Sequence, residues 1–150
     1  MPPALDAVLA AYPSWSHLVV RLALGVIFFA HGSQKVLGWF GGPGLSGTIK
    51  FMGGLGVPRA AAVTAAFIEL LGGCAMIVGF LARPAAVGII VIMLVAIAQV
   101  HGKNGFFLQG KTGPGYEFNF ALIAMALSIL IGGAGVLSID RALSIALGGD

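Results

Sequence analysis

Four long apolar stretches dominate this sequence, and each is about as long as a helix that crosses a lipid bilayer. They cover residues 17–38, 60–82, 84–101 and 117–137. A bilayer core of about 30 Å needs about 20 mostly apolar residues in helical form. Apolar and polar residues do not alternate strictly in these stretches, which favours helices over a membrane barrel. The sequence therefore predicts an all-α, polytopic membrane protein, built as a bundle of four transmembrane helices.

Charged side chains are too scarce for a water-soluble protein of this length. The 150 residues include 8 Lys or Arg and 5 Asp or Glu, so 9% are charged and 59% are hydrophobic. Soluble domains carry about 25% charged residues. We expect residues 1–150 to form a single domain that contacts the lipid bilayer, as a multi-pass protein of the cell (inner) membrane. The basic residues form no run, so no nucleic-acid partner is expected.

Glycine is abundant and falls in two informative settings. Gly25 and Gly32 are one heptad apart in the first span, and Gly72 and Gly73 follow Glu69 in the second. Small residues let helices approach closely in lipid, so we expect tight packing between these spans. The first loop, from Trp39 to Gly47, is glycine-rich and contains a GxGxxG pattern. No strand precedes this pattern, so it does not indicate a dinucleotide site.

The end of the chain predicts a short interfacial helix. Residues 138–147 place apolar side chains at helical spacing beside charged ones. A frayed continuation of the fourth span is the alternative reading. Arg21, near this end of the first span, has Asp140 as its candidate partner.

Polar side chains gather in the other half of the expected bundle. An ionisable residue inside a span costs at least about 2.5 kcal/mol at the bilayer centre, so each one asks for a reason. All four spans contribute, and such groups should face the bundle interior and pair. The candidates for ligand binding or proton relay are His31, Lys35, Glu69, His101, Glu117 and Asn119.

Aromatic residues of the two loops at this end are candidates for lining a pocket around the polar cluster. They are Trp39, Phe40, Phe106 and Phe107. Two histidines supply groups that exchange protons near neutral pH, which suits a proton-linked pocket for a small polar-headed lipophile such as a quinone. Structural roles stay open: Lys35 could snorkel to the interface, and Glu117 could serve its helix N-terminus. No HExxH or ExxH spacing is present, so we predict no metal.

The order of these motifs resembles the DoxX family of small four-helix membrane proteins. The resemblance runs from about Arg21 to Asp140 and is carried by short pieces in a fixed order. They are Arg21-x3-Gly25, His31-Gly32-x2-Lys35, Gly38-Trp39-Phe40-Gly41-Gly42-x-Gly44, Gly47-Thr48, Phe51-Met52, Leu55-Gly56, Pro58, Glu69-x2-Gly72-Gly73, Arg83-x-Ala85-Ala86, Val100-His101, Gly105-Phe106-Phe107 and Glu117-Phe118-Asn119.

The resemblance implies a membrane component of an oxidoreductase system, in some members linked to quinones. It supplies no settled catalytic motif, so catalytic residues stay unknown. Any thiol chemistry needs a partner protein, because Cys74 is alone in this chain.

Three functions stay open at this point. The first is a redox-linked subunit that binds a quinone-like molecule or relays protons and acts with a redox partner protein. The second is a non-enzymatic transporter or channel, in which glycine-rich faces allow a homo-oligomer. The third is a membrane scaffold whose polar cluster only fixes helix register.

Overall fold

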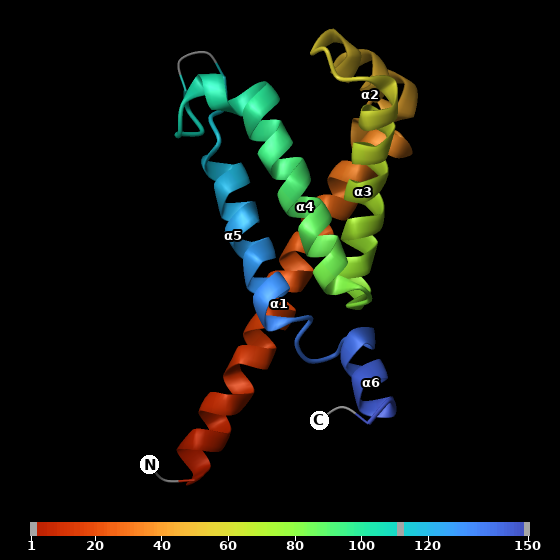
Figure 1. The fold of residues 1–150 in the computed structure, drawn as a ribbon. Helices are drawn as coiled ribbons and strands as arrows, with labels where there is room; N and C mark the ends of the chain where they lie inside the picture. The colour runs from red at the N-terminus through yellow and green to blue at the C-terminus, as the bar shows by residue number, and fades with distance from the viewer. Residues whose placement is uncertain (1–2, 111–112, 149–150) are drawn as a thin grey trace.

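The computed structural model describes residues 3–110 and 113–148, with side chains described from residue 15 onward. These residues form helices joined by short loops (Figure 1). In chain order the helices are α1 (Pro3–Val36), η1 (Trp39–Gly41), α2 (Gly44–Gly54), α3 (Arg59–Val78), α4 (Ala82–Ala96), the π-helix η2 (Ile97–His101), η3 (Gly102–Asn104), α5 (Glu117–Gly132) and α6 (Ile139–Ala146). The predicted all-α membrane fold is confirmed.

Four helices enclose the interior of the molecule. α1 packs most extensively against α3, α3 against α4, α4 against α5, and α5 returns to α1. The short helix α2 lies beside the α1 and α3 ends at one pole, and α6 lies at the other pole with both chain ends (Figure 1). Apolar residues of these helices, among them Leu24, Met76, Ile89 and Ile129, form the core.

Three helical segments are long and apolar enough to cross a membrane. They are Trp15–Val36, Arg59–Val78 and Ala82–Asn104. The fourth expected span, 117–137, is helical only over Glu117–Gly132. Gly133 ends that helix with a φ of 82°, and its 16 residues rise about 24 Å. α5 is therefore an apolar helix shorter than the bilayer core, and it lies alongside α4.

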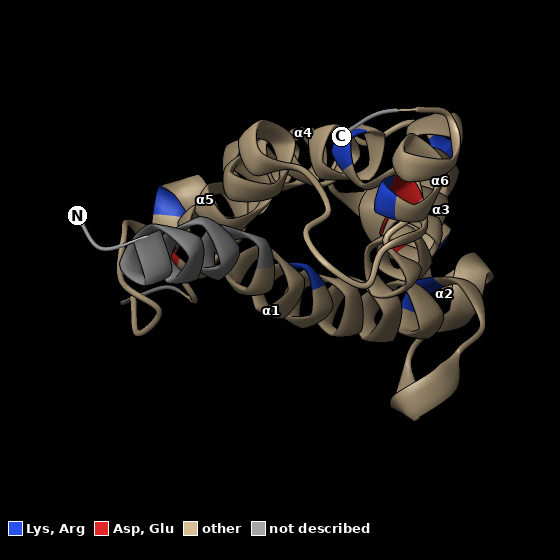
Figure 2. Cartoon of the chain, turned by 90° about the horizontal axis from the view of Figure 1, so that it is seen from below, with Lys and Arg blue, Asp and Glu red and all other residues tan. Residues whose placement is uncertain are grey.

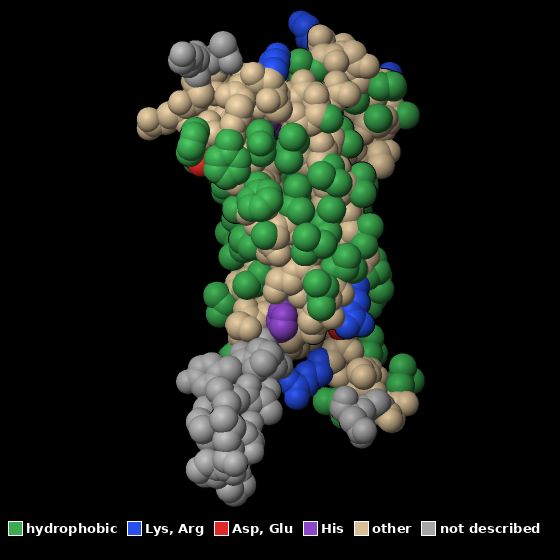
Figure 3. All heavy atoms as spheres, turned by 60° about the vertical axis from the view of Figure 1, so that its left-hand side comes forward, with side chains coloured by type: hydrophobic (Ala, Val, Ile, Leu, Met, Phe, Trp, Pro, Cys, Tyr) green, Lys and Arg blue, Asp and Glu red, His purple; other side chains and the backbone are tan. Residues whose placement is uncertain are grey.

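The outer surface of the bundle is apolar around its middle. Figure 3 shows a band of hydrophobic side chains there, with basic side chains at the two ends of the face shown. Large apolar side chains such as Val26, Leu71 and Val91 are more than half exposed. Contiguous exposed apolar surface of this kind marks a lipid-facing protein. The sides of the bundle accordingly contact lipid, and the charged ends lie toward water.

Glycines bring α1 and α3 into backbone contact. A Cβ on Gly32 would clash with the backbone of Leu70, and one on Gly73 would clash with the backbone of Phe29. The expected close packing of the first two spans is present. Gly72 differs from its neighbour, because its added Cβ would lie 3.9 Å from Ile89 in ordinary contact.

Arg21 ties three segments together at the α6 pole. Its guanidinium is fully buried and donates to the carbonyls of Met76 (2.6 Å) and Ile77 (2.8 Å) at the end of α3. It also donates to the carbonyls of Ala134 (2.9 Å) and Leu137 (3.0 Å) in the loop after α5. These carbonyls lie at or beyond helix ends, where no intrahelical donor reaches them.

Asp140 interacts electrostatically with Arg21, as the sequence suggested, but no ion pair within 4.0 Å joins the two among the described side chains. Its carboxylate accepts from the N–H groups of Leu81 (2.8 Å) and Ala82 (2.9 Å) at the start of α4. A carboxylate at a helix N-terminus satisfies unpaired donors and favours the helix dipole. α6 is itself capped by Ser138, whose hydroxyl accepts from the N–H of Arg141, so the expected short C-terminal helix is present.

We predict that Gly73→Ala destabilises the protein while Gly72→Ala does not. The added methyl at position 73 must push α1 away from α3, and overpacking of this kind costs about 1–3 kcal/mol. Thermal unfolding in detergent micelles, followed by tryptophan fluorescence, measures the difference. Equal melting temperatures for the two variants would show that the helices are not in backbone contact.

Arg21→Lys should also lower stability. A single ammonium group cannot reach four carbonyls that belong to two segments, so buried acceptors lose their donors at a cost of about 2 kcal/mol or more. The control is Arg59→Lys, which changes an exposed arginine at the start of α3. In the same unfolding measurement the control should have nearly the melting temperature of the wild type. An unchanged melting temperature for Arg21→Lys would show that the hydrogen bonds of Arg21 to the four carbonyls do not stabilise the protein.

Candidate functional site

A cavity of about 290 Å³ lies between the four helices α1, α3, α4 and α5. α1, α3, α4 and α5 all contribute side chains, and the loop before α5 contributes part of the wall. Five of the six polar candidates line it. The lining residues are Ile27, Phe28, His31, Lys35, Glu69, Met93, Ala96, His101, Leu108, Pro114, Gly115, Phe118, Asn119 and Leu122.

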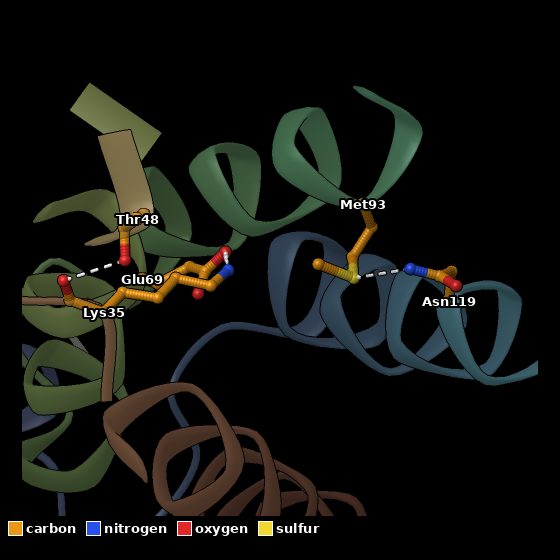
Figure 4. A network of polar contacts seen from close by, with 5 residues as sticks. All are labelled: Lys35, Thr48, Glu69, Met93 and Asn119. Atoms are coloured by element: carbon orange, nitrogen blue, oxygen red, sulfur yellow. Dashed lines mark hydrogen bonds and ion pairs between the residues drawn. The ribbon is translucent and has the colours of Figure 1, made fainter. Parts of the chain in front are cut away.

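An ion pair between α1 and α3 forms one wall of the cavity. The Lys35 Nζ lies 2.5 Å from the Glu69 Oε1, as Figure 4 shows. The Glu69 side chain is 3% exposed and the Lys35 side chain 35% exposed, so the pair reaches from the interior toward the edge of the bundle. The main-chain carbonyl of Lys35 accepts from the Thr48 hydroxyl at 3.1 Å, which fixes α2 against the end of α1.

The second carboxylate oxygen of Glu69 has no partner. Its Oε2 is buried, and no described side chain or backbone group donates to it. A buried acceptor without a donor costs about 1–3 kcal/mol, and more when the group is charged. Since Glu69 lines the cavity, a ligand or an ordered water there is the candidate donor to this atom.

α4 and α5 form the opposite wall with weaker polar contacts. The Asn119 amide lies 3.3 Å from the Met93 sulfur (Figure 4). A thioether is a weak acceptor, so this contact uses little of the hydrogen-bonding capacity of the amide. Asn119 follows Phe118 and precedes Leu122 at helical spacing, and all three face the cavity. This wall therefore offers apolar contact with one adaptable polar group.

A π-helix turns His101 toward the cavity. Residues Ile97–His101 form this wider turn at the end of α4. Single π turns inside helices are often found at functional sites. The His101 Nδ1 lies 3.0 Å from the carbonyl oxygen of Pro114, which can only accept, so Nδ1 carries the proton. In the neutral ring, Nε2 is then an acceptor.

Glu117 stands apart from the other polar candidates. Its Oε1 accepts from the N–H of Leu108 at 2.8 Å, and it does not line the cavity. The bond closes the loop 105–116 over the start of α5, together with a bond of 2.8 Å from the N–H of Glu117 to the Phe106 carbonyl. Glu117 thus shapes the cavity indirectly, because Leu108 is a lining residue.

None of the four loop aromatics lines the cavity, contrary to expectation. Trp39 and Phe40 lie in η1 and are more than half exposed, with their ring centroids 6.4 Å apart. Phe106 packs on Phe107 at 5.5 Å, and both are exposed. The loops carry these rings outside the helix ring. Side chains of the helices themselves, which recur at three- and four-residue spacing, supply most of the lining instead.

The polar groups do not assemble a metal site. Among the described side chains, no three of His, Cys, Asp and Glu come close enough to ligate one ion. The cavity instead combines an acceptor on Glu69, a donor on Lys35, a second acceptor on His101 and mostly apolar walls. Pockets for small organic ligands have this character: apolar walls with a few placed polar groups.

The fold and the cavity define a polytopic helical membrane protein with a polar interior site. The chain belongs to the DoxX family, whose sequence description matches residues 16–102. The matched segment includes Lys35, Glu69 and His101. No solved structure matches the chain.

Three named relatives are similar over most of their length. A protein of Bacillus subtilis (strain 168) named "Putative oxidoreductase CatD" is 32% identical over 123 residues, which are 82% of this chain and 83% of that protein. Inner membrane protein YphA of Escherichia coli (strain K12) is 29% identical over 130 residues, or 83% of this chain and 87% of YphA. Inner membrane protein YqjF of the same organism is 28% identical over 127 residues, or 85% and 91% of the two chains.

We predict that Lys35→Met destabilises the protein more than the double variant Lys35→Met/Glu69→Leu. The single change leaves a buried carboxylate without its counter-ion, which costs about 3–5 kcal/mol, whereas replacing both partners by apolar side chains is close to neutral. The free energy of unfolding in detergent micelles is measured for the wild type, for Lys35→Met, for Glu69→Leu and for the double variant. These four proteins form a double-mutant cycle. Additive effects would show that the two side chains are not coupled.

Proposed function

We propose that this protein is a membrane subunit of a redox-linked oxidoreductase system and that its cavity binds a small lipophilic molecule of the quinol type. The observation that carries this proposal is the buried, unpartnered Oε2 of Glu69, a residue that lines the cavity. It asks for a ligand that brings a hydrogen-bond donor into an otherwise apolar space.

The size of the cavity suits a molecule with one ring. An apolar cavity of about 150 Å³ holds benzene. About 290 Å³ leaves room for a single ring with small substituents. The walls that would contact such a ring are apolar, with Phe28, Met93, Phe118 and Leu122 among them. The lipid around the bundle would be the source of a lipophilic ligand.

The polar groups favour a ring with two hydroxyls. Glu69 on α3 offers one acceptor, and the Nε2 of neutral His101 at the end of α4 offers a second. A benzoquinol carries a hydroxyl at each of two opposite ring positions, so it could donate to both helices. The oxidised quinone has carbonyl acceptors instead, for which the Lys35 ammonium and a protonated His101 are the available donors.

The same residues suit proton transfer. Oxidation of a quinol to a quinone releases two protons and two electrons. The Glu69 carboxylate and the His101 imidazole each accept one proton in this proposal. Lys35 and His31 extend from the cavity toward the exposed edge of the bundle, where protons can leave. The two electrons pass to a redox partner protein in this proposal. Cys74 is the one cysteine of the chain, so the chain has no internal disulfide that could accept them.

The relatives support the setting of this function. One carries the word oxidoreductase in its name, and two are named inner membrane proteins. We infer that residues 1–150 form one domain of the cell inner membrane, with α5 as a fourth, short span. A membrane of locally reduced thickness accommodates a short span at modest cost.

The test is binding of a short-chain benzoquinol to the purified protein in detergent micelles. We predict that Glu69→Gln weakens binding about tenfold to hundredfold, because a hydrogen bond to a charged acceptor contributes about 1.5–3 kcal/mol. Isothermal titration calorimetry measures the affinity. The quinone content of organic extracts from the same preparations gives an independent reading.

Glu117→Gln is the matched control. It removes a carboxylate from the same pole of the bundle, and its amide oxygen still accepts from Leu108. Its quinol affinity should equal that of the wild type. Equal affinity in wild type and Glu69→Gln would refute the cavity as the binding site. If Glu69→Gln changes only the melting temperature and no protein binds quinol, the quinol proposal is refuted and the scaffold hypothesis is favoured over it.

A further inference from the structure

A second and larger hollow lies at the opposite pole of the molecule, among α1, α4, α5 and α6. It has a volume of about 870 Å³ and is open to the outside. We call it the polar groove. Its lining residues are Trp15, Leu81, Arg83, Pro84, Gly132, Gly133, Ala134, Gly135, Val136, Ser138, Asp140, Arg141 and Ser144. The proposed quinol cavity shares none of these residues.

Basic groups outnumber acidic ones around the polar groove. Arg83 and Arg141 line it, and the buried Arg21 lies directly behind its wall, where it bonds the carbonyl of Ala134. Asp140 is the one lining carboxylate, and both of its oxygens already accept from the N–H groups at the start of α4. Figure 2, seen from the pole that carries α6, shows acidic and basic positions side by side on that helix. The lining side chains therefore carry a net positive charge, and Arg83 also donates to the carbonyl of Ile131 at 3.4 Å.

The loop that forms the floor of the groove adds main-chain donors. Its carbonyls at Ala134 and Leu137 accept from Arg21, and that of Gly135 accepts from the Ser138 hydroxyl. Ala134, Gly135 and Val136 line the groove, and their N–H groups have no acceptor among the residues that the structure describes. A ligand with several acceptor oxygens and negative charge would satisfy them together with the arginines.

The position of the polar groove favours a lipid phosphate over a solute. α6 is strongly amphipathic: Asp140, Arg141 and Ser144 face the groove, while Ile139 and Leu143 lie on the opposite side of the helix. Such helices lie in the membrane interface with the apolar face toward the acyl chains. Trp15 and Leu81, which flank the groove, are each 53% exposed and apolar enough to contact a chain that leaves it.

We propose that the polar groove binds the phosphate group of an anionic phospholipid. The headgroup phosphate lies between Arg83 and Arg141 beside residues 134–136, and the acyl chains run along the apolar flank. Basic pockets beside membrane helices recognise lipid headgroups in this way. The bound lipid would brace α6 against the start of α4, where Asp140 already holds it.

The test is native mass spectrometry of the full protein in micelles that contain either phosphatidylglycerol or phosphatidylcholine. Wild type should retain phosphatidylglycerol preferentially. Arg83→Gln/Arg141→Gln should lose about thirtyfold in phosphatidylglycerol affinity, since each basic residue near an anionic lipid contributes about a factor of five. The control Lys50→Gln/Arg59→Gln removes the same charge from exposed positions at the other pole and should bind like the wild type.

Three further results decide the proposal. Arg83→Lys/Arg141→Lys keeps the charge and should keep most of the binding, which excludes misfolding as the cause of the loss. Displacement of the lipid by an excess of inorganic phosphate would overturn the lipid assignment in favour of a free phosphate site. Equal retention of both lipids, or equal losses in the groove and control variants, would show that the groove binds no phosphate group specifically.

Discussion

The ion pair between Lys35 and Glu69 is the interaction on which the interior of this protein depends. Lipid supplies no hydrogen bonds, so a buried carboxylate must find its counter-charge inside the bundle. Lys35 satisfies one oxygen of Glu69 and leaves the other, which is buried, without a partner among the described residues. The interaction therefore joins α1 to α3 and at the same time leaves one acceptor for a ligand. Stability and proposed function meet at this residue.

Arg21 solves the same problem at the other pole by a different route. It uses main-chain carbonyls at the end of α3 and after α5, while Asp140 satisfies the first N–H groups of α4. Arg21 thus binds carbonyl groups at the end of α3 and after α5, and Asp140 binds the N–H groups at the start of α4. Between the two poles the contact of α1 with α3 relies on Gly32 and Gly73 and allows no added side chain. The polar residues and the glycines together fix the register of the bundle.

Much of this arrangement follows from the sequence, because the length of an apolar stretch predicts a membrane helix and the few charged residues within it predict which side faces the interior. The helices, the tight glycine contact and the convergence of His31, Lys35, Glu69, His101 and Asn119 were all predictable in that way. The position of the loop aromatics was not. Trp39 and Phe106 lie near the cluster in sequence, but a positive φ at Phe40 and the turn after Gly105 carry the rings outward. Loop direction depends on such backbone details, which spacing does not encode.

The π turn at Ile97–His101 changes the direction in which the side chains after α4 point. An α-helix advances about 100° per residue, so one extra residue in a turn shifts the phase of every side chain that follows. Upstream of the turn, Met93 and Ala96 face inward by ordinary helical spacing; downstream, His101 does so only because of the shift. One continuous helical segment thereby turns apolar side chains inward along α4 and a polar side chain, His101, inward at its end.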